Sequence, residues 1–277
     1  NFEMALGFMY LDWNGTIYNN LINAVDVCTR VGMNLDINNI NNITGGNASN
    51  GGNIGNFTGL EAFVSLEYLD IAGHSISTFP NNNSLSFAPC LKEFNCASTN
   101  IDVSTLDFTQ NSVLEHVWFN GCTSNSGPLP LSPINNPKLK ILRAASCGIG
   151  SYTSGAYDFS VWPCLTKIQF AANNMTSFDF TGLTSLTYLD VSSNPMTTID
   201  VSMCTALAFF YIHGCPNITD IYLGINIDLN NLHGGCNQSI CFKTAGSNAA
   251  VQIHVGSQAR VNQAVALWGN IVGTFVQ

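Results

Sequence analysis

Positive charge is the scarcest feature of this 277-residue chain, which has 8 Lys and Arg against 17 Asp and Glu. Proteins that bind nucleic acids or anionic membrane surfaces need clustered Lys and Arg, so this composition argues against both functions. No run reaches the roughly 18 consecutive apolar residues that a membrane-spanning helix requires. The chain instead has 46% apolar residues and 35 Asn, which can supply a core and an uncharged polar surface.

Motifs of common enzymes and metal sites are also missing. The chain has no G-x-S-x-G, H-E-x-x-H, Walker or G-x-G-x-x-G sequence, and no C-x-x-C pair. We therefore expect a protein that is not an enzyme and that uses no cofactor and no metal.

A short apolar phrase recurs along most of the chain. Residues 186–194 read LTYLDVSSN, which fits L-x-x-L-x-L-x-x-N. A second element, apolar-x-apolar, precedes several copies by eight residues, at 106–108, 178–180, 199–201 and 221–223. Each repeat therefore contains two extended segments. The copies start at Leu66, Leu91, Leu114, Leu139, Leu165, Leu186, Leu207, Leu229 and Ala250.

The ninth position of each copy has its own chemistry. Stacked coils leave buried backbone groups between them, and Asn, Thr or Cys side chains can pair those groups as a ladder. This accounts for three of the ten cysteines, and we expect most cysteines to be buried free thiols, with Cys236 and Cys241 as the best disulfide candidates. The ladder column reads His74, Thr99, Cys122, Cys147, Asn173, Asn194, Cys215, Asn237 and Gln258.

The pattern resembles the leucine-rich repeat family, in particular its bacterial form of about 21 residues with LTxLDVSxN texture, seen best at 184–201. The resemblance implies a β-rich solenoid, a right-handed coil with a parallel sheet on the concave face and an irregular or extended convex side. It also implies binding through the sheet face rather than catalysis. A parallel β-helix polysaccharide lyase or hydrolase has coils of similar length, but no cluster of acids and bases stacks on neighbouring coils here.

Both ends of the chain have apolar residues at helical spacing, from Ile17 to Cys28 after Thr16 and from Val261 to Phe275. A solenoid exposes its end coils, so these segments predict short helical caps. We therefore expect a cap and an Asn/Gly-rich segment at 1–59, a repeat array of about nine coils at 60–258, and a capping helix at 259–277.

Residues between the apolar positions of each strand should project from the concave face. Aromatic rings there are favoured anchors for protein or glycan ligands, although aromatic residues also suit strands for conformational reasons. The predicted ligand-binding residues are Tyr68, Asp70, His116, Trp118, Arg143, Tyr188, Asp190, Phe209 and Tyr211.

Two further groups of polar residues deserve comparison with known kinds of site. His233 and His254 fall in one column of adjacent copies, but two histidines without a third ligand make a weak metal site. Asp107, Asp179 and Asp200 lie in the second segments, where we expect them to bond turn backbone or face solvent rather than to bind Ca²⁺ or catalyse a reaction.

These observations predict a non-enzymatic recognition or adhesion module that binds a protein or glycan through the concave face, in an extracellular, cell-surface or particle-surface location. The alternative is a structural subunit of a virion, phage tail or surface filament, assembled by packing of solenoids. We expect no nucleic-acid partner and no membrane insertion. Eight N-x-S/T sequons permit glycosylation only in a secretory setting. They begin at Asn14, Asn42, Asn47, Asn56, Asn82, Asn174, Asn217 and Asn237.

Overall fold

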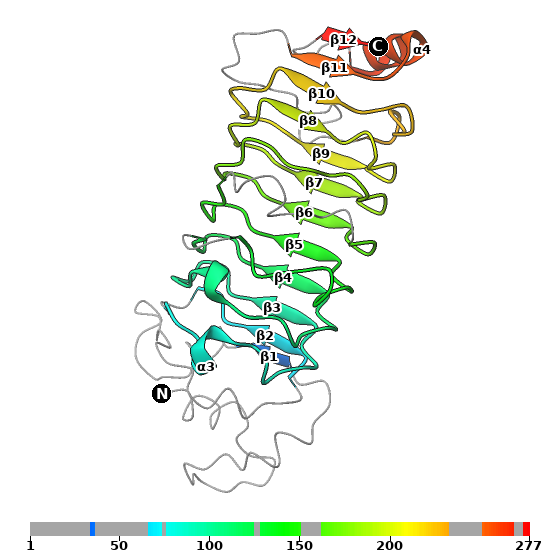
Figure 1. Cartoon of the computed structure of the whole chain (residues 1–277). Helices are drawn as coiled ribbons and strands as arrows, with labels where there is room; N and C mark the ends of the chain where they lie inside the picture. Colours follow the sequence, from blue (N-terminus) through cyan, green and yellow to red (C-terminus); the bar gives the residue numbers. More distant parts are fainter. Residues whose placement is uncertain are drawn as a thin grey trace, which may run out of the picture. The chain divides into compact units, whose positions relative to one another are not determined.

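The structure, a computed structural model, describes residues 34–36, 66–73, 76–124, 128–150, 162–232, 251–268 and 274–277. The chain divides into two compact units, which we call unit 1 (Asn1–Lys138) and unit 2 (Leu139–Gln277). Each unit contains short parallel strands stacked coil upon coil (Figure 1). The predicted leucine-rich repeat solenoid is thereby confirmed.

The sheet of unit 1 has strands that pair in parallel in chain order. Its register aligns the middle residues, so that Leu69 lies opposite Phe94 and Phe94 opposite Val117. A short helix, α3 (Pro80–Asn83), and a 3-10 turn (Val103–Thr105) lie in the connections. The strands are β1 (Asn34–Asp36), β2 (Tyr68–Asp70), β3 (Glu93–Asn95) and β4 (His116–Trp118).

Unit 2 contains strands of two kinds. The strands of the first kind, which follow the L-x-x-L-x-L phrase, are β5 (Ile141–Arg143), β6 (Lys167–Gln169), β7 (Tyr188–Asp190) and β9 (Phe209–Tyr211), paired in that order. The others form a second parallel sheet in the order β12-β11-β10-β8. These are β8 (Thr198–Asp200), β10 (Asp220–Tyr222), β11 (Gln252–His254) and β12 (Thr274–Val276).

The core of each coil is filled by the apolar residues of both extended segments. Successive side chains of a strand point to opposite faces, so the middle residue of each three-residue strand points inward. In unit 1, Phe94 contacts Phe108 and Phe119 with ring centroids 5.4 and 6.3 Å apart. In unit 2, Phe170 and Phe180 are likewise buried.

From Gly73 to Gly214, the residue before each ladder position adopts a left-handed backbone conformation in the turn that follows the strand. Glycine occupies this column three times, and Gly214 has φ 68°. Elsewhere the column holds small residues such as Ser193, with φ 57°. The Cβ that a side chain would add at Gly214 would meet Ser193 Oγ at 3.0 Å, so the stacked coils leave little room there.

The prediction that residues 250–258 continue the first-sheet repeats is wrong. Ile253 pairs with Ile221 of β10 and with Phe275 of β12, so β11 belongs to the second sheet. The predicted ladder residue Gln258 begins helix α4 (Gln258–Trp268) instead. The copy at Leu229 forms no strand within residues 224–232, although Leu229 and Leu232 are buried.

The C-terminal helix is shorter than the apolar spacing predicted. It ends at Trp268, and the segment around Phe275 forms strand β12, because pairing with β11 competes successfully with helical spacing there. Strand β1 lies in a run that the repeat template does not cover. The predicted N-terminal helix, His74, His233, Asn237, and the Cys236–Cys241 pair lie outside the described residues.

Candidate recognition surface

We call β2–β7 and β9, the strands that follow the L-x-x-L-x-L phrase, the first-sheet strands. The first and third residues of each project outward, away from the buried middle residue. In the sheet of unit 2, strand register lines them up in two columns, the first through Lys167, Tyr188 and Phe209. The third residues of the same strands form the second column, which includes Asp190 and Tyr211. We call the outward positions of β2–β4, together with Glu67 and Lys92 just before β2 and β3, the unit 1 face. The outward positions of β5, β6, β7 and β9 form the unit 2 face.

Threonines just before the strands help to fix this register. Thr166 Oγ1 lies 3.1 Å from the carbonyl O of Lys140, and Thr187 Oγ1 lies 3.0 Å from the carbonyl O of Thr166. Each hydroxyl therefore donates a hydrogen bond to the preceding coil, next to the backbone hydrogen bonds of the strands. Backbone and threonine hydrogen bonds together therefore fix the strands that carry the outward side chains.

On the unit 1 face, opposite charges meet one another. Lys92 Nζ lies 2.8 Å from Glu67 Oε2, and this hydrogen bond raises the pKa of Lys92. His116 Nδ1 lies 2.9 Å from Glu93 Oε1, and the His116 and Trp118 rings pack edge to face with centroids 5.6 Å apart.

A hydrogen bond between side chains also joins two coils of this face, since Asn95 Nδ2 donates to Asp70 Oδ2 at 3.0 Å. Asp70 also caps the following turn, where its Oδ1 accepts from the backbone N–H of Ala72. The four predicted residues of unit 1 thus lie on one face; they are Tyr68, Asp70, His116 and Trp118. Ion pairs and hydrogen bonds between neighbouring coils hold several of them in place.

The unit 2 face is dominated by rings. The Tyr188 centroid lies 5.2 Å from that of Tyr211 and 6.0 Å from that of Phe209. Phe209 is 42% exposed to solvent, so part of its ring is available for contact with a ligand. Burial, followed by the nearby charge of Asp190, raises the pKa of Tyr188.

Two residues that the sequence-based site omits complete this arrangement. Lys167 Nζ lies 3.9 Å from the Tyr188 ring centroid, a cation–π contact. Gln169 Nε2 donates to the Tyr188 hydroxyl at 3.4 Å. Lys167 and Gln169 lie in the same two columns as the predicted residues, so their position in the repeat could have identified them as part of the site. Desolvation, and then the positive charge of Arg143, lower the pKa of Lys167.

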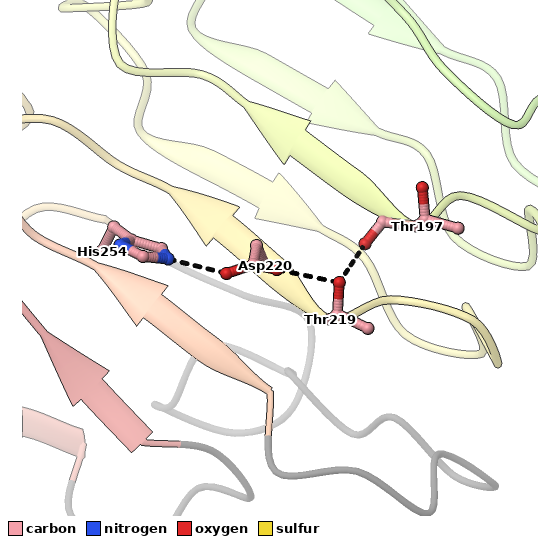
Figure 2. A network of polar contacts seen from close by, with 4 residues as sticks. All are labelled: Thr197, Thr219, Asp220 and His254. Atoms are coloured by element: carbon pink, nitrogen blue, oxygen red, sulfur yellow. Dashed lines mark hydrogen bonds and ion pairs between the residues drawn. The ribbon is translucent and has the colours of Figure 1, made fainter.

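The second sheet has a polar cluster of its own (Figure 2). His254 Nε2 lies 2.8 Å from Asp220 Oδ1, and Thr219 Oγ1 lies 2.8 Å from Asp220 Oδ2 and 3.1 Å from the carbonyl O of Thr197. The bond from His254, and then that from Thr219, lower the pKa of Asp220. Tyr222 stacks on His254 with centroids 4.1 Å apart. His254 is thus bonded to Asp220, while His233, its column neighbour in the sequence, lies outside the described residues.

The ladder side chains bond backbone groups between coils. Asn194 Nδ2 donates to the carbonyls of Phe170 and Val191, both at 2.9 Å, and its Oδ1 accepts from the N–H of Met175. Asn173 makes similar bonds one coil earlier, where its Oδ1 accepts from the N–H of Cys147. These amides satisfy donors and acceptors on two coils at once.

Sulfur and hydroxyl groups occupy other positions of the ladder. Cys122 Sγ lies 2.9 Å from the carbonyl O of Cys96 and 3.7 Å from Cys96 Sγ, and Thr99 Oγ1 lies 2.8 Å from the same carbonyl. Cys215 Sγ lies 3.5 Å from the carbonyl O of Val191.

Seven cysteines are described, all as free thiols. Cys90 and Cys164 are exposed. The other five are buried, namely Cys96, Cys122, Cys147, Cys204 and Cys215.

A second asparagine ladder was not expected. Asn111 Nδ2 donates to the carbonyls of Leu85 and Ala88, and Asn136 Nδ2 donates to those of Phe108 and Asn111. Both asparagines are fully buried and lie three residues before a repeat start. The shared N-x-x-L spelling at Asn111 and Asn136 was the signal that could have revealed them.

The acids of the second segments bond turn backbone, as expected. A carboxylate oxygen of Asp107, Asp179 and Asp200 accepts from the N–H two residues later in each case. Among the described residues, no group of three or more His, Cys, Asp or Glu is placed to hold a metal ion. Within the same part of the chain, no helix is long and apolar enough to cross a membrane.

Comparisons with known proteins found structural likenesses only, since no family model and no curated protein matches the chain. The functional domain of InlJ from Listeria monocytogenes, described as including a cysteine ladder, is 16% identical with a TM-score of 0.42 and covers 88% of this chain. This chain spans only 56% of that domain's length.

Two other solved structures give weaker likenesses. Internalin C2 from the same organism is 14% identical over 68% of this chain and 80% of its own, with a TM-score of 0.38. A leucine-rich repeat protein of Leptospira interrogans is 10% identical over 79% of this chain and 62% of its own, with a TM-score of 0.33. The fold assignment rests on the strand register and ladder bonds described above.

Proposed function

We propose that this chain is a non-enzymatic recognition or adhesion module that binds a protein through the outward faces of its first-sheet strands. The observation that carries the proposal is the ring cluster of Tyr188, Phe209 and Tyr211, held on a rigid sheet with Phe209 substantially exposed. Large, rigid rings give much contact area for little loss of conformational entropy, and such residues dominate the energetics of many interfaces.

The scaffold suits this role because the strands hold the rings in place before a partner arrives. Tyr188 is held by Lys167 and Gln169 as well as by its neighbouring rings. Preorganised side chains lose less entropy on binding than flexible ones. On unit 1, Tyr68, Asp70, His116 and Trp118 form a separate, more polar candidate surface. A secreted, cell-surface or particle-surface location belongs to the same proposal.

The test is a binding screen with the whole chain and matched variants. Arrays of secreted proteins, cell-surface ectodomains and glycans are probed with the wild type and with the triple variant Tyr188→Ala, Phe209→Ala, Tyr211→Ala. We expect protein ligands whose binding the triple variant weakens by at least tenfold. The control is Met203→Ser, which removes an exposed apolar residue outside both faces. Ligands that bind the wild type and the triple variant equally would refute the proposal.

A second candidate is a structural subunit that packs against copies of itself. Its support is the group of exposed apolar residues in the C-terminal part of unit 2, where Ile225 is 62% exposed and Val265 52% exposed, with Leu267 and Tyr222 also exposed. Light scattering on the purified chain separates the two candidates. A monomer that binds its ligand favours recognition, whereas a regular assembly that buries the first-sheet faces favours the structural role.

A further inference from the structure

Two cysteine side chains of unit 1 meet between neighbouring coils. The Sγ atoms of Cys96 and Cys122 lie 3.7 Å apart, and both side chains are buried. We infer that this pair is a redox-sensitive modification site, at which hydrogen peroxide converts the two thiols into a disulfide that links the two coils. The inference goes beyond the proposed function and does not depend on it.

The repeat explains why the two sulfurs meet. Cys96 is the third apolar residue of the copy that starts at Leu91, and Cys122 is the ladder residue of the next copy, which starts at Leu114. The backbones of the two coils are paired here, since the N–H of Cys96 donates to the carbonyl O of Trp118 at 3.0 Å. The ladder position directs Cys122 Sγ toward the preceding coil, where it lies 2.9 Å from the carbonyl O of Cys96. Strand pairing and the ladder turn together place the sulfurs side by side.

The distance between the sulfurs allows a bond to form after a small movement. A disulfide bond is about 2.05 Å long, so the two atoms need to approach each other by about 1.7 Å. Rotation of both side chains about their Cα–Cβ bonds can supply this approach. It removes the bond from Cys122 Sγ to the carbonyl O of Cys96, but Thr99 Oγ1 already donates to the same oxygen at 2.8 Å. The buried carbonyl therefore keeps a partner when the disulfide forms.

The ionisation of Cys122 supports its role as the sulfur that reacts first. Its bond with the Cys96 thiol, opposed by desolvation and aided by bonds from Thr99, lowers the pKa of Cys122 to about 7. Burial instead raises the pKa of Cys215, a buried ladder thiol of unit 2, and raises that of Cys204 to about 12. The thiolate is the form that attacks peroxide, so Cys122 should react before these two thiols near neutral pH.

The reaction has two steps. The Cys122 thiolate attacks one oxygen of hydrogen peroxide, so that an S–O bond forms, the O–O bond breaks, and the leaving hydroxide takes a proton from solvent to become water. The sulfur of Cys96 then attacks the sulfur of Cys122, so that the S–S bond forms, the S–O bond breaks, and the thiol proton of Cys96 leaves with the hydroxyl group as a second water. The two sulfurs together lose two electrons, and one peroxide is reduced to two waters.

The experiment treats the reduced, folded chain with a small excess of hydrogen peroxide. The remaining thiols are then blocked with N-ethylmaleimide in denaturant, and the monomer is digested after Lys and Glu. This digestion places Cys96 in peptide 94–115 and Cys122 in peptide 116–138, each with a single cysteine. Mass spectrometry should find these two peptides joined, and a reductant should separate them. Selecting the monomer removes chains linked through the exposed Cys90.

The chain offers a matched internal control in Cys215. It is also a buried ladder thiol, but the residue that matches Cys96 in the preceding coil is Val191. At the peroxide dose that links Cys96 to Cys122, Cys215 should stay reduced in at least tenfold greater proportion than Cys122. Equal oxidation of Cys122 and Cys215 would overturn the inference. So would sulfinic acid on Cys122 without the link, or a link that forms only in the unfolded chain.

Thermal unfolding gives a second readout. The disulfide joins residues 26 positions apart, and closing this loop should raise the melting temperature of the peroxide-treated wild type by about 5 °C or more. Cys96→Ala and Cys122→Ala should each abolish the rise, whereas Cys215→Ala should keep it. A rise that persists in Cys122→Ala would show that another modification causes it and would overturn the inference. The peptide measurement on the wild type decides the matter even if a variant fails to fold.

Discussion

The two units close their coils in the same way, but among the described ladder positions only unit 2 has amides, beside Cys147 and Cys215. In unit 2, Asn173 and Asn194 each bond backbone groups of two coils through both ends of the amide. In unit 1, the same column holds Thr99 and Cys122, which make fewer and weaker bonds around the carbonyl O of Cys96. The geometry of the turn is thus common to both units, while the strength of the ladder bonds is local.

The outward faces differ in a parallel way. On the unit 1 face, charges neutralise one another between coils, as Lys92 does with Glu67. On the unit 2 face, a cation lies over a ring and beside a second cation. The unit 1 pairs are therefore candidates for stabilising contacts between coils, and the unit 2 rings are the centre of the proposed binding surface.

The largest expected effect tests the ladder. Asn194→Leu should lower the free energy of unfolding by about 3 kcal/mol, because several buried backbone groups lose their partner at about 1–3 kcal/mol each. Cys122→Ala should cost less, about 1 kcal/mol, since it removes one sulfur and its weak bond. Urea unfolding of both variants gives the comparison.

Asn217→Leu is the matched control, because Asn217 is an exposed asparagine whose amide makes a single bond of 3.4 Å to the carbonyl of Pro195. It should change the free energy of unfolding by less than about 0.5 kcal/mol. Equal losses for Asn194→Leu and Cys122→Ala would show that the amide and sulfur positions of the ladder are equivalent.

The strand positions could be predicted because the repeat is strict where the core needs it. Phe94, Leu142 and Leu189 each follow the first apolar residue of a copy at a fixed distance, so the phrase alone locates β3, β5 and β7. The sheet to which a strand belongs could not be read in the same way. Ile253 lies in a local pattern that fits either segment, and only its pairing with Ile221 decides the matter.

The candidate site could be predicted in part for the same reason. Column positions follow from register, so Tyr188, Phe209 and Tyr211 were recognisable as outward neighbours. The bend of Lys167 over the Tyr188 ring depends on side-chain rotamers and desolvation, which no periodic pattern encodes. Asn111 was missed because only Asn136 shares its residue type at this position, whereas other copies have Ala88, Trp162, Leu183 or Cys204 there.

An effect of intermediate size concerns the dependence of stability on pH. Hydrogen bonds from Cys96 and Thr99 lower the pKa of Cys122 to about 7, below its ordinary value near 9. The folded state therefore holds fewer protons than the unfolded state between pH 7 and pH 9, and stability rises with pH in this window. That contribution is lost as pH falls through 7. Burial has the opposite effect on Cys204, whose pKa rises to about 12.

The measurement compares the wild type with Cys122→Ala and Cys204→Ala by urea unfolding under reducing conditions. Between pH 7 and pH 9 the wild type should gain about 1–2 kcal/mol relative to Cys122→Ala, at about 1.36 kcal/mol per pKa unit. Above pH 9 the wild type should lose stability relative to Cys204→Ala, because only its unfolded state ionises there. Parallel curves for all three proteins would contradict the assigned thiol environments.

The smallest expected effect compares the two lysines of the faces. The paired neighbour Glu67 raises the pKa of Lys92, so the folded state favours its charge, whereas desolvation and Arg143 lower the pKa of Lys167, so the folded state disfavours its charge. Glu67→Gln should therefore lower the melting temperature by about 2 °C or less, and added salt should reduce this loss. Lys167→Gln should leave the melting temperature unchanged or raise it slightly. A fall in melting temperature for Lys167→Gln equal to that for Glu67→Gln would remove the electrostatic distinction between the two faces.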